Sequence, residues 1–307
     1  MNAEFDLSQW DGKFGNKRSL PDTIIGSSEH VPHIIDSALR RYDELNPVDR
    51  PDETALIQRL LDAVYIQRER VGLLEIQHGD SIKSKLTGLN DPIQRVQAFN
   101  GRIKIGSDVD KTLTETDSYL NHIPGSVLAE NYMDHPDHGR AVRPLVHARY
   151  WKIGMDHPWA REYSKQVGKN APLRPGVISF FEALKTQQIP TTLISANFRP
   201  FIDGLAENLP KDSFQKIWCT DAEDILSTDK GTVIKQEIFD HPDRAFIFIG
   251  DGLSDVPATT ASDYVAFYFA LEGGGFARKL EEKKLPYFTY KNFKDVHQKL
   301  QELQCMI

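Results

Sequence analysis

The sequence predicts an α/β protein: a parallel sheet with a helical cap inserted after the first strand and a helical N-terminal extension. The first observation is a set of short apolar or β-branched runs with the length of strands, at 102–107, 190–195, 215–219, 245–250 and 264–269. The second is that helical stretches separate these runs, because strands that alternate with helices indicate a parallel sheet covered on both faces. The third is a long interval that breaks this alternation between the first two runs.

The first piece of the chain, residues 1–98, is predicted to be the helical extension. Between 52 and 76, apolar residues recur at helical spacing with charged residues between them, which is typical of an amphipathic helix. A shorter helix is expected at 31–45 and ends before Pro47, because the residue preceding a proline disfavours helical geometry. We expect these helices to pack on the core, to mediate dimerisation or to contact another protein.

The sheet-forming core is predicted to comprise residues 99–113 and 175–307. The interval 114–174 between them is rich in histidine, proline and aromatic residues, and its prolines separate the helical segments that we expect there. Parallel sheets bind their ligands in a crevice at the carboxyl ends of the strands. An insertion after the first strand would therefore cover that crevice as a cap.

Composition limits the classes of function. The 307 residues are 40% hydrophobic and 26% charged, as in a soluble globular protein, and the net charge of −7 argues against a protein that grips nucleic acid. The two cysteines provide no disulfide framework. The chain starts without a secretory signal pattern and has no apolar run that could span a bilayer. We therefore expect a cytoplasmic protein with neither a nucleic-acid nor a membrane partner.

Two carboxylates follow the first predicted strand, in the pentad Asp108-Val109-Asp110-Lys111-Thr112. Aspartates separated by one residue at a strand end can be directed at one point, so that one attacks while the other transfers protons. A carboxylate and a phosphate repel each other by about 4 kcal/mol at about 4 Å and an effective dielectric of about 20. A phosphate ester therefore demands a divalent cation, fixed dipoles and a lysine beside such a nucleophile.

Two later segments offer a hydroxyl and an ammonium. Ser195 ends the second predicted strand beside the start of a helix, where it would contact an anion or simply cap the helix. Lys230 precedes Gly231, so it can approach a phosphoryl oxygen without side-chain crowding. Lys235, one helical turn later, is the competing lysine, and an isolated lysine is most often a solvated surface group.

The fourth segment is Gly250-Asp251-Gly252-Leu253-Ser254-Asp255, which follows the buried run at 245–250. The flanking glycines permit a tight turn that presents the Asp251 carboxylate at the edge of the sheet. With the first aspartate pair, Asp251 gives hard oxygen ligands suited to Mg²⁺. A polar turn would explain this segment alone, but not why four such segments fall at strand ends or helix starts of one predicted sheet.

Together these segments resemble the motifs of the haloacid dehalogenase superfamily, and of its phosphatases in particular, over residues 101–290. The corresponding residues are Asp108 and Asp110 in motif one, Ser195 in motif two, Lys230 in motif three, and Asp251 with Asp255 in motif four. The run Leu173-Arg174-Pro175-Gly176 looks most like phosphoserine phosphatase and its relatives. The resemblance implies a Rossmann-like parallel sheet as the core.

The resemblance further implies a Mg²⁺-dependent hydrolase of small phosphomonoesters that works through an aspartyl-phosphate. Asp108 would be the nucleophile and Asp110 the acid–base catalyst. Mg²⁺ would bind the Asp108 carboxylate, the Asp110 backbone carbonyl and Asp251. The other implied site residues are the phosphate-binding Ser195, Ala196 and Lys230, the supporting Thr112, Ser254 and Asp255, and Asp117 or Glu115 for the amine of a phosphoserine-like substrate.

Two alternative functions stay open. Phosphotransfer to an acceptor other than water would use the same residues, and only the products distinguish it from hydrolysis. A non-catalytic partner-binding protein on the same scaffold predicts losses among the acidic residues or the lysine, and none of these is missing. Superfamily dehalogenases lack an aspartate at the position of Asp110, so its presence selects phosphoryl chemistry. The sequence does not identify the substrate.

Overall fold

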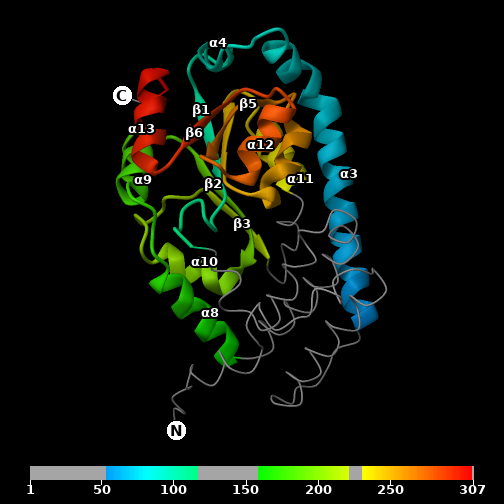
Figure 1. Cartoon of the computed structure of the whole chain (residues 1–307). Helices are drawn as coiled ribbons and strands as arrows, with labels where there is room; N and C mark the ends of the chain where they lie inside the picture. The colour runs from blue at the N-terminus through cyan, green and yellow to red at the C-terminus, as the bar shows by residue number, and fades with distance from the viewer. Residues whose placement is uncertain (1–52, 117–157, 221–229, 306–307) are drawn as a thin grey trace, which may run out of the picture.

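The computed structural model describes residues 53–116, 158–220 and 230–305 (Figure 1). A six-stranded sheet lies at its centre in the order β3-β2-β1-β4-β5-β6, with every neighbouring pair parallel. The strands are β1 (Ile103–Ser107), β2 (Thr191–Phe198), β3 (Lys216–Thr220), β4 (Ala245–Gly250), β5 (Val265–Leu271) and β6 (Tyr287–Tyr290). The predicted α/β fold with a parallel sheet is confirmed.

The five predicted runs correspond to β1 through β5, whereas β6 was not predicted. The central strands β1 and β4 are buried along their whole length, as expected of strands covered on both faces. In contrast, β6 has four residues, lies at the edge of the sheet and is only partly buried, so it lacks the continuous apolar run that marks the others. The second strand also continues beyond its predicted end at residue 195, to Phe198.

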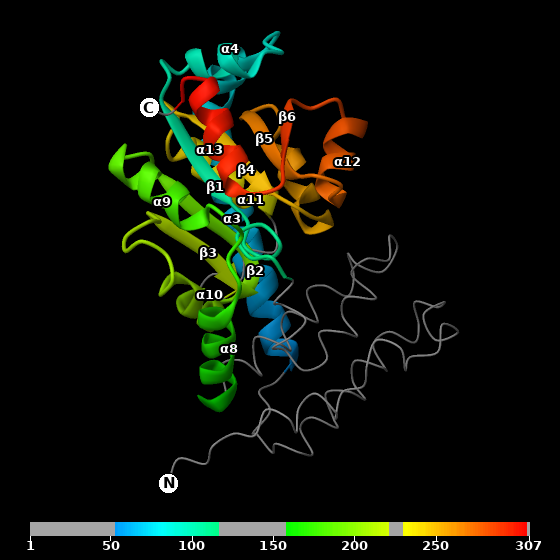
Figure 2. The same ribbon diagram turned by 60° about the vertical axis from the view of Figure 1, so that its left-hand side comes forward.

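Helices cover both faces of the sheet. They are α3 (Glu53–Leu86), α4 (Pro92–Gln97), α8 (Pro158–Asn170), α9 (Val177–Thr186), α10 (Arg199–Ala206), α11 (Lys230–Phe239), α12 (Gly275–Glu282) and α13 (Phe293–Glu302), with a 3₁₀-helix η4 (Leu253–Ala261) after β4. Figures 1 and 2 show α9 and α13 side by side, and the rings of Phe180 and Phe293 join them at 5.2 Å between centroids. Helices α11 and α3 pack together on the other side (Figure 1). None of the helices in the described part of the chain has the length and apolarity that a membrane span requires.

The long helix α3 belongs to the predicted N-terminal extension and continues ten residues beyond its predicted end at residue 76, to Leu86. It packs along α11, and polar side chains take part in this contact. Glu75 accepts hydrogen bonds from Lys235 Nζ at 3.0 Å and from the Tyr264 hydroxyl at 2.7 Å. The predicted helix at 31–45, with its expected dimer or partner contacts, lies outside the described residues.

Helix α8 falls within the interval predicted to form the cap, and it crosses α10 at very short range. A Cβ atom added to Gly204 of α10 would lie 1.9 Å from the backbone oxygen of Lys165 in α8. A bridge between Thr114 and Leu173 joins the two ends of the interval next to the core. The close crossing therefore depends on glycine, which allows the two helix backbones to approach.

A buried ion pair connects three strands to α11 on the face of the sheet that α11 covers. Lys104 Nζ of β1 lies 2.7 Å from Glu237 Oε2 of α11, and both side chains are 2% exposed. Thr192 of β2 and Trp218 of β3 each donate a hydrogen bond to the same carboxylate at 2.7 Å. Buried charges are tolerated when they are paired and hydrogen-bonded in this way.

Candidate active site

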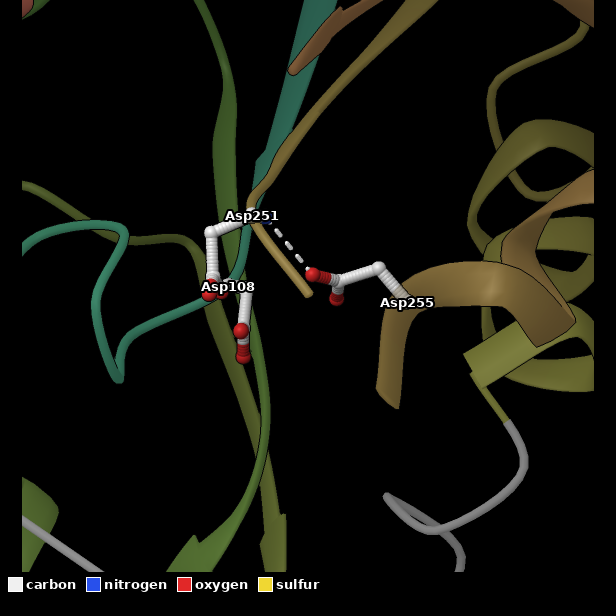
Figure 3. A group of neighbouring side chains, drawn as sticks. All are labelled: Asp108, Asp251 and Asp255. Carbon is white, nitrogen blue, oxygen red and sulfur yellow. Dashed lines mark hydrogen bonds between the residues drawn. The ribbon is translucent and has the colours of Figure 1, made fainter. Parts of the chain in front are cut away.

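Three buried aspartates meet at the carboxyl end of the sheet. Asp108 follows β1 and Asp251 follows β4, two neighbouring strands whose register pairs Ser107 with Ile249. Asp255 comes from η4, and one oxygen of each carboxylate lies within 4.8 Å of the others. Figure 3 shows the three side chains around one point, with the Asp251 backbone hydrogen-bonded to Asp255.

Lys230 places its ammonium between two of these aspartates. Its Nζ lies 2.7 Å from Asp108 Oδ1 and 2.6 Å from Asp255 Oδ1, and the side chain is 2% exposed. Lys235, the competing lysine of the sequence analysis, instead pairs with Glu75 of α3 at 3.0 Å. Of the two lysines, the structure therefore brings only Lys230 to Asp108.

Gly231 has a structural use that the sequence analysis did not identify. A Cβ at this position would lie 2.5 Å from the backbone oxygen of Pro257 and 2.1 Å from the Thr260 hydroxyl. The missing side chain thus lets the first turn of α11 pack directly against η4. This packing sets the position of Lys230, which begins the helix.

Asp255 and Thr112 hold the turn that carries Asp251. Asp255 Oδ2 accepts hydrogen bonds from the backbone N–H groups of Asp251 at 2.8 Å and Gly252 at 3.1 Å. The Thr112 hydroxyl donates to Asp251 Oδ1 at 3.2 Å. Asp255 therefore fixes the turn with one oxygen and Lys230 with the other.

Burial and mutual repulsion shift the acid–base equilibria of the cluster. Burial, reinforced by the nearby charge of Asp255, raises the pKa of Asp108 well above its usual value. The same two causes raise the pKa of Asp251 to about 7. Burial opposes the charge on Lys230, but the carboxylates of Asp108 and Asp255 outweigh it and raise the pKa of Lys230. Both raised pKa values therefore reflect a site whose fully ionised form would hold more negative charge than the Lys230 ammonium offsets.

This donor set fits a divalent cation. When ionised, the three carboxylates exceed the single ammonium by two charges. The contacts of Lys230 and Thr112 take one oxygen each of Asp108 and Asp251, and the second oxygen of each carboxylate is a candidate ligand. Carboxylate oxygens in small number are what Mg²⁺ prefers in proteins.

Asp110 and Ser195 are linked through a residue that sequence reasoning missed, Asn197 of β2. Its side-chain Nδ2 donates to Asp110 Oδ2 at 2.9 Å, and its backbone N–H donates to Ser195 Oγ at 3.0 Å. The alternative in which Ser195 caps the following helix is wrong, because β2 continues past it and Phe198 occupies the N-cap of α10. The available signal was a polar residue two positions after the predicted end of the strand.

Arg174 is a second supporting residue that was not predicted to act on the site. Its guanidinium donates to the backbone oxygens of Lys111 at 2.6 Å, Thr112 at 3.2 Å and Lys291 at 3.1 Å. It thus joins the turn after Asp108 to the segment that precedes α9. No simple residue pattern announces such contacts, because they are made to backbone carbonyls.

The other predicted site residues lie around the cluster or outside the described residues. Ala196 lies between Ser195 and Asn197 in β2, and Ser254 lies in η4, partly exposed. Glu115 is exposed, and its backbone N–H donates to the Pro172 carbonyl at 2.9 Å. Asp117, the other candidate for a substrate amine, lies outside the described residues.

Comparisons with known proteins give one family and several similar proteins. The sequence model of the haloacid dehalogenase-like hydrolases matches residues 105–259. Pdp3-interacting factor 1 of Schizosaccharomyces pombe is 23% identical over an alignment of 156 residues, which covers 44% of this chain and 66% of that protein, so the chain spans just under two thirds of that relative.

Two solved structures are among those to which this chain is similar. The haloacid dehalogenase-like protein SP0104 of Streptococcus pneumoniae has a TM-score of 0.42 and 21% identity, covering 65% of this chain and 99% of that one. A phosphoserine phosphatase in its apo form has a TM-score of 0.45 and 14% identity, with coverage of 64% and 98%.

Proposed function

Because this chain belongs to the haloacid dehalogenase-like hydrolase family, we propose that it is a phosphatase that hydrolyses a small phosphorylated metabolite with Asp108 as the nucleophile. The resemblance found in the four motifs is confirmed at the level of the family. The observation that carries the finer proposal is the buried contact of Lys230 with Asp108, beside Asp251. This arrangement offers a nucleophile, a fixed positive charge and a cation site within one cluster.

In the first step, a carboxylate oxygen of Asp108 attacks phosphorus and the ester P–O bond breaks. The leaving oxygen takes a proton from Asp110, and the phosphoryl group stays on Asp108 as an aspartyl-phosphate. Lys230 and the Ser195 hydroxyl face the negative charge of the phosphoryl oxygens. The buried position of these groups strengthens their electrostatic effect, because water does not screen them.

In the second step, Asp110 is a carboxylate and removes a proton from water. The water oxygen attacks phosphorus, the bond to Asp108 breaks, and inorganic phosphate leaves. Asp110 regains the proton that it gave to the leaving group in the first step, so the cycle is balanced. Hydrolysis is thereby distinguished from phosphotransfer, in which an acceptor other than water would lose that proton.

We propose that Mg²⁺ is held by the carboxylates of Asp108 and Asp251 and by the backbone carbonyl of Asp110. When bound, it neutralises charge on the nucleophile and the phosphoryl group, which lowers their repulsion. Asp255 accepts a hydrogen bond from the backbone N–H of Asp251 and so keeps that residue in place. Thr112 donates to the Asp251 carboxylate and orients it. Ligands that are fixed by such neighbours bind a metal more tightly.

The test compares wild type with Asp108→Asn for phosphate release from 4-nitrophenyl phosphate, with Mg²⁺ and with EDTA. We expect Asp108→Asn to lose about a thousandfold or more in turnover, as removal of a covalent nucleophile does, and to retain its circular-dichroism spectrum. We expect EDTA to abolish wild-type turnover and added Mg²⁺ to restore it. Asp243→Asn is the control, since Asp243 is an exposed partner of Arg102 on the surface.

Normal hydrolysis by Asp108→Asn would contradict the covalent route. Turnover that is unaffected by EDTA would contradict the metal requirement. A panel of phosphorylated metabolites, measured on wild type, would then identify the substrate and test the expectation of a phosphoserine-like ester. Release of free phosphate in equal amount to the dephosphorylated product would separate hydrolysis from phosphotransfer.

A further inference from the structure

Asn197 lies at an irregular part of β2, which aims its side chain at the turn after β1. The register between β2 and β3 shifts between Ile194 and Phe198, and Asn197 is fully buried within this shift. Irregularities of this kind redirect a side chain near active sites. Here the side chain spans from β2 to Asp110, with 2.9 Å between Asn197 Nδ2 and Asp110 Oδ2.

The orientation of the Asn197 amide is fixed by a second hydrogen bond. Its Oδ1 accepts from the backbone N–H of Phe198 at 2.8 Å. A flipped amide would place an NH₂ group against that N–H, so Nδ2 must be the atom that faces Asp110. The same residue also directs Ser195, because its backbone N–H donates to Ser195 Oγ at 3.0 Å.

We infer that Asn197 is the positioning residue for proton transfer by Asp110, an inference that rests on the proposed function. Because an N–H of Asn197 already occupies Oδ2, the proton that Asp110 delivers is carried by Oδ1. That proton moves from Oδ1 to the leaving oxygen as the ester P–O bond breaks. Asn197 thus holds the Asp110 carboxyl group in one orientation, and the protonated oxygen Oδ1 keeps a fixed position relative to Ser195.

A positioning role predicts a loss that depends on the leaving group. A phenolate made stable by a nitro group leaves without much help, whereas an unsubstituted phenolate needs a proton. General acid catalysis contributes about 10²- to 10⁴-fold, and displacement of a catalytic group by about 1 Å can cost about 100-fold. Loss of Asn197 should therefore affect phenyl phosphate far more than 4-nitrophenyl phosphate, although the two esters have similar shapes.

The experiment measures kcat/KM for both esters, since this ratio reports the steps through departure of the leaving group. We expect Asn197→Ala to lose roughly 10- to 100-fold on phenyl phosphate and only a few-fold on 4-nitrophenyl phosphate. Asn197→Asp keeps the size of the side chain and an acceptor for the Phe198 N–H, but an ionised carboxylate cannot donate to Asp110. We expect it to show the same selective loss.

Thr192→Ala is the matched control, because Thr192 is buried in the same strand and donates a hydrogen bond to Glu237 of α11 rather than to Asp110. It should lower the stability of the protein and leave the ratio between the two esters unchanged. Equal losses on both esters in the Asn197 variants would overturn the inference and leave the proposed function intact. No hydrolysis by wild type would overturn the proposed function and this inference with it. If Asn197→Ala does not fold, Asn197→Asp decides the outcome.

Discussion

Replacement of Lys230 by methionine should separate the roles that this residue has in folding and in catalysis. Methionine has a similar length and no charge, so Lys230→Met removes the ammonium that lies 2.7 Å from Asp108 and 2.6 Å from Asp255. Both carboxylates are buried, at 4% and 0% side-chain exposure. The variant therefore leaves two like charges close together, without their shared counter-charge.

The expected cost follows from that geometry. At an effective dielectric of about 20, one ammonium–carboxylate pair is worth about 4 kcal/mol at about 4 Å, and burial of the ammonium offsets part of this gain. Removal of one partner of a buried pair costs about 3–5 kcal/mol in measured cases. We therefore expect the free energy of unfolding to fall by about 3–5 kcal/mol without metal. Saturating Mg²⁺ should recover part of this loss, because a cation near Asp108 replaces the missing charge.

Urea unfolding with and without Mg²⁺ measures this difference, and hydrolysis of 4-nitrophenyl phosphate measures the catalytic effect. Loss of one fixed electrostatic group from an active site costs about 10²- to 10³-fold in turnover. Lys235→Met is the matched control on the same helix. Its pair with Glu75 is partly exposed, at 22% and 34%, so we expect a cost of about 0–1 kcal/mol and normal turnover. A Lys230→Met protein as stable and active as wild type would refute the reasoning.

Two further predictions concern stability. Burial would raise the pKa of Glu237, but the charge of Lys104 and the hydrogen-bond donors outweigh burial and lower that pKa. The ion pair therefore stabilises the protein at any pH above the usual carboxyl pKa. This stabilisation is lost as the pH falls through the lowered pKa of Glu237. Glu237→Gln should lower the free energy of unfolding by about 3–5 kcal/mol at pH 7. Urea unfolding at acid pH should show a smaller difference in this free energy between wild type and variant. An unchanged difference would contradict the lowered pKa of Glu237. Gly204→Ala should cost about 1–3 kcal/mol, because its Cβ would meet the Lys165 backbone. Gly72→Ala in α3 meets no atom within 4 Å, so it should be neutral or slightly stabilising, and equal destabilisation by both changes would argue against the close crossing of α8 and α10.

The sequence was most informative where chemistry and sheet topology coincide. Runs of apolar residues predicted β1 and β4, and parallel strands put their carboxyl ends at one edge, so Asp108 and Asp251 were expected to meet there. The same logic placed Lys230 at a helix start. These features follow from local residue order together with one general rule of topology.

The features that were missed depend on long-range pairing instead. Asn197 faces Asp110 because β2 is irregular at that point, and a register shift has no local signature in the residues. Lys104 lies in the middle of a buried strand, where only its contact with Glu237 makes a charge tolerable. That partner is more than a hundred residues away in sequence, so a reading of strand periodicity treats Lys104 as an exception.

Helix α11 explains why the N-terminal helix α3 packs against the core at all. Nearly every residue of α11 is buried, so it cannot face water and needs a cover on the side away from the sheet. Its first turn packs on η4 at Gly231, its middle is held by Lys235 and Glu75 of α3, and its last turn ends in the Glu237 network. Catalytic groups must stay within about 0.5 Å of their working geometry. The packing of the first turn at Gly231 and the Glu237 network give Lys230 that constraint, while α3 covers the outer side of the helix.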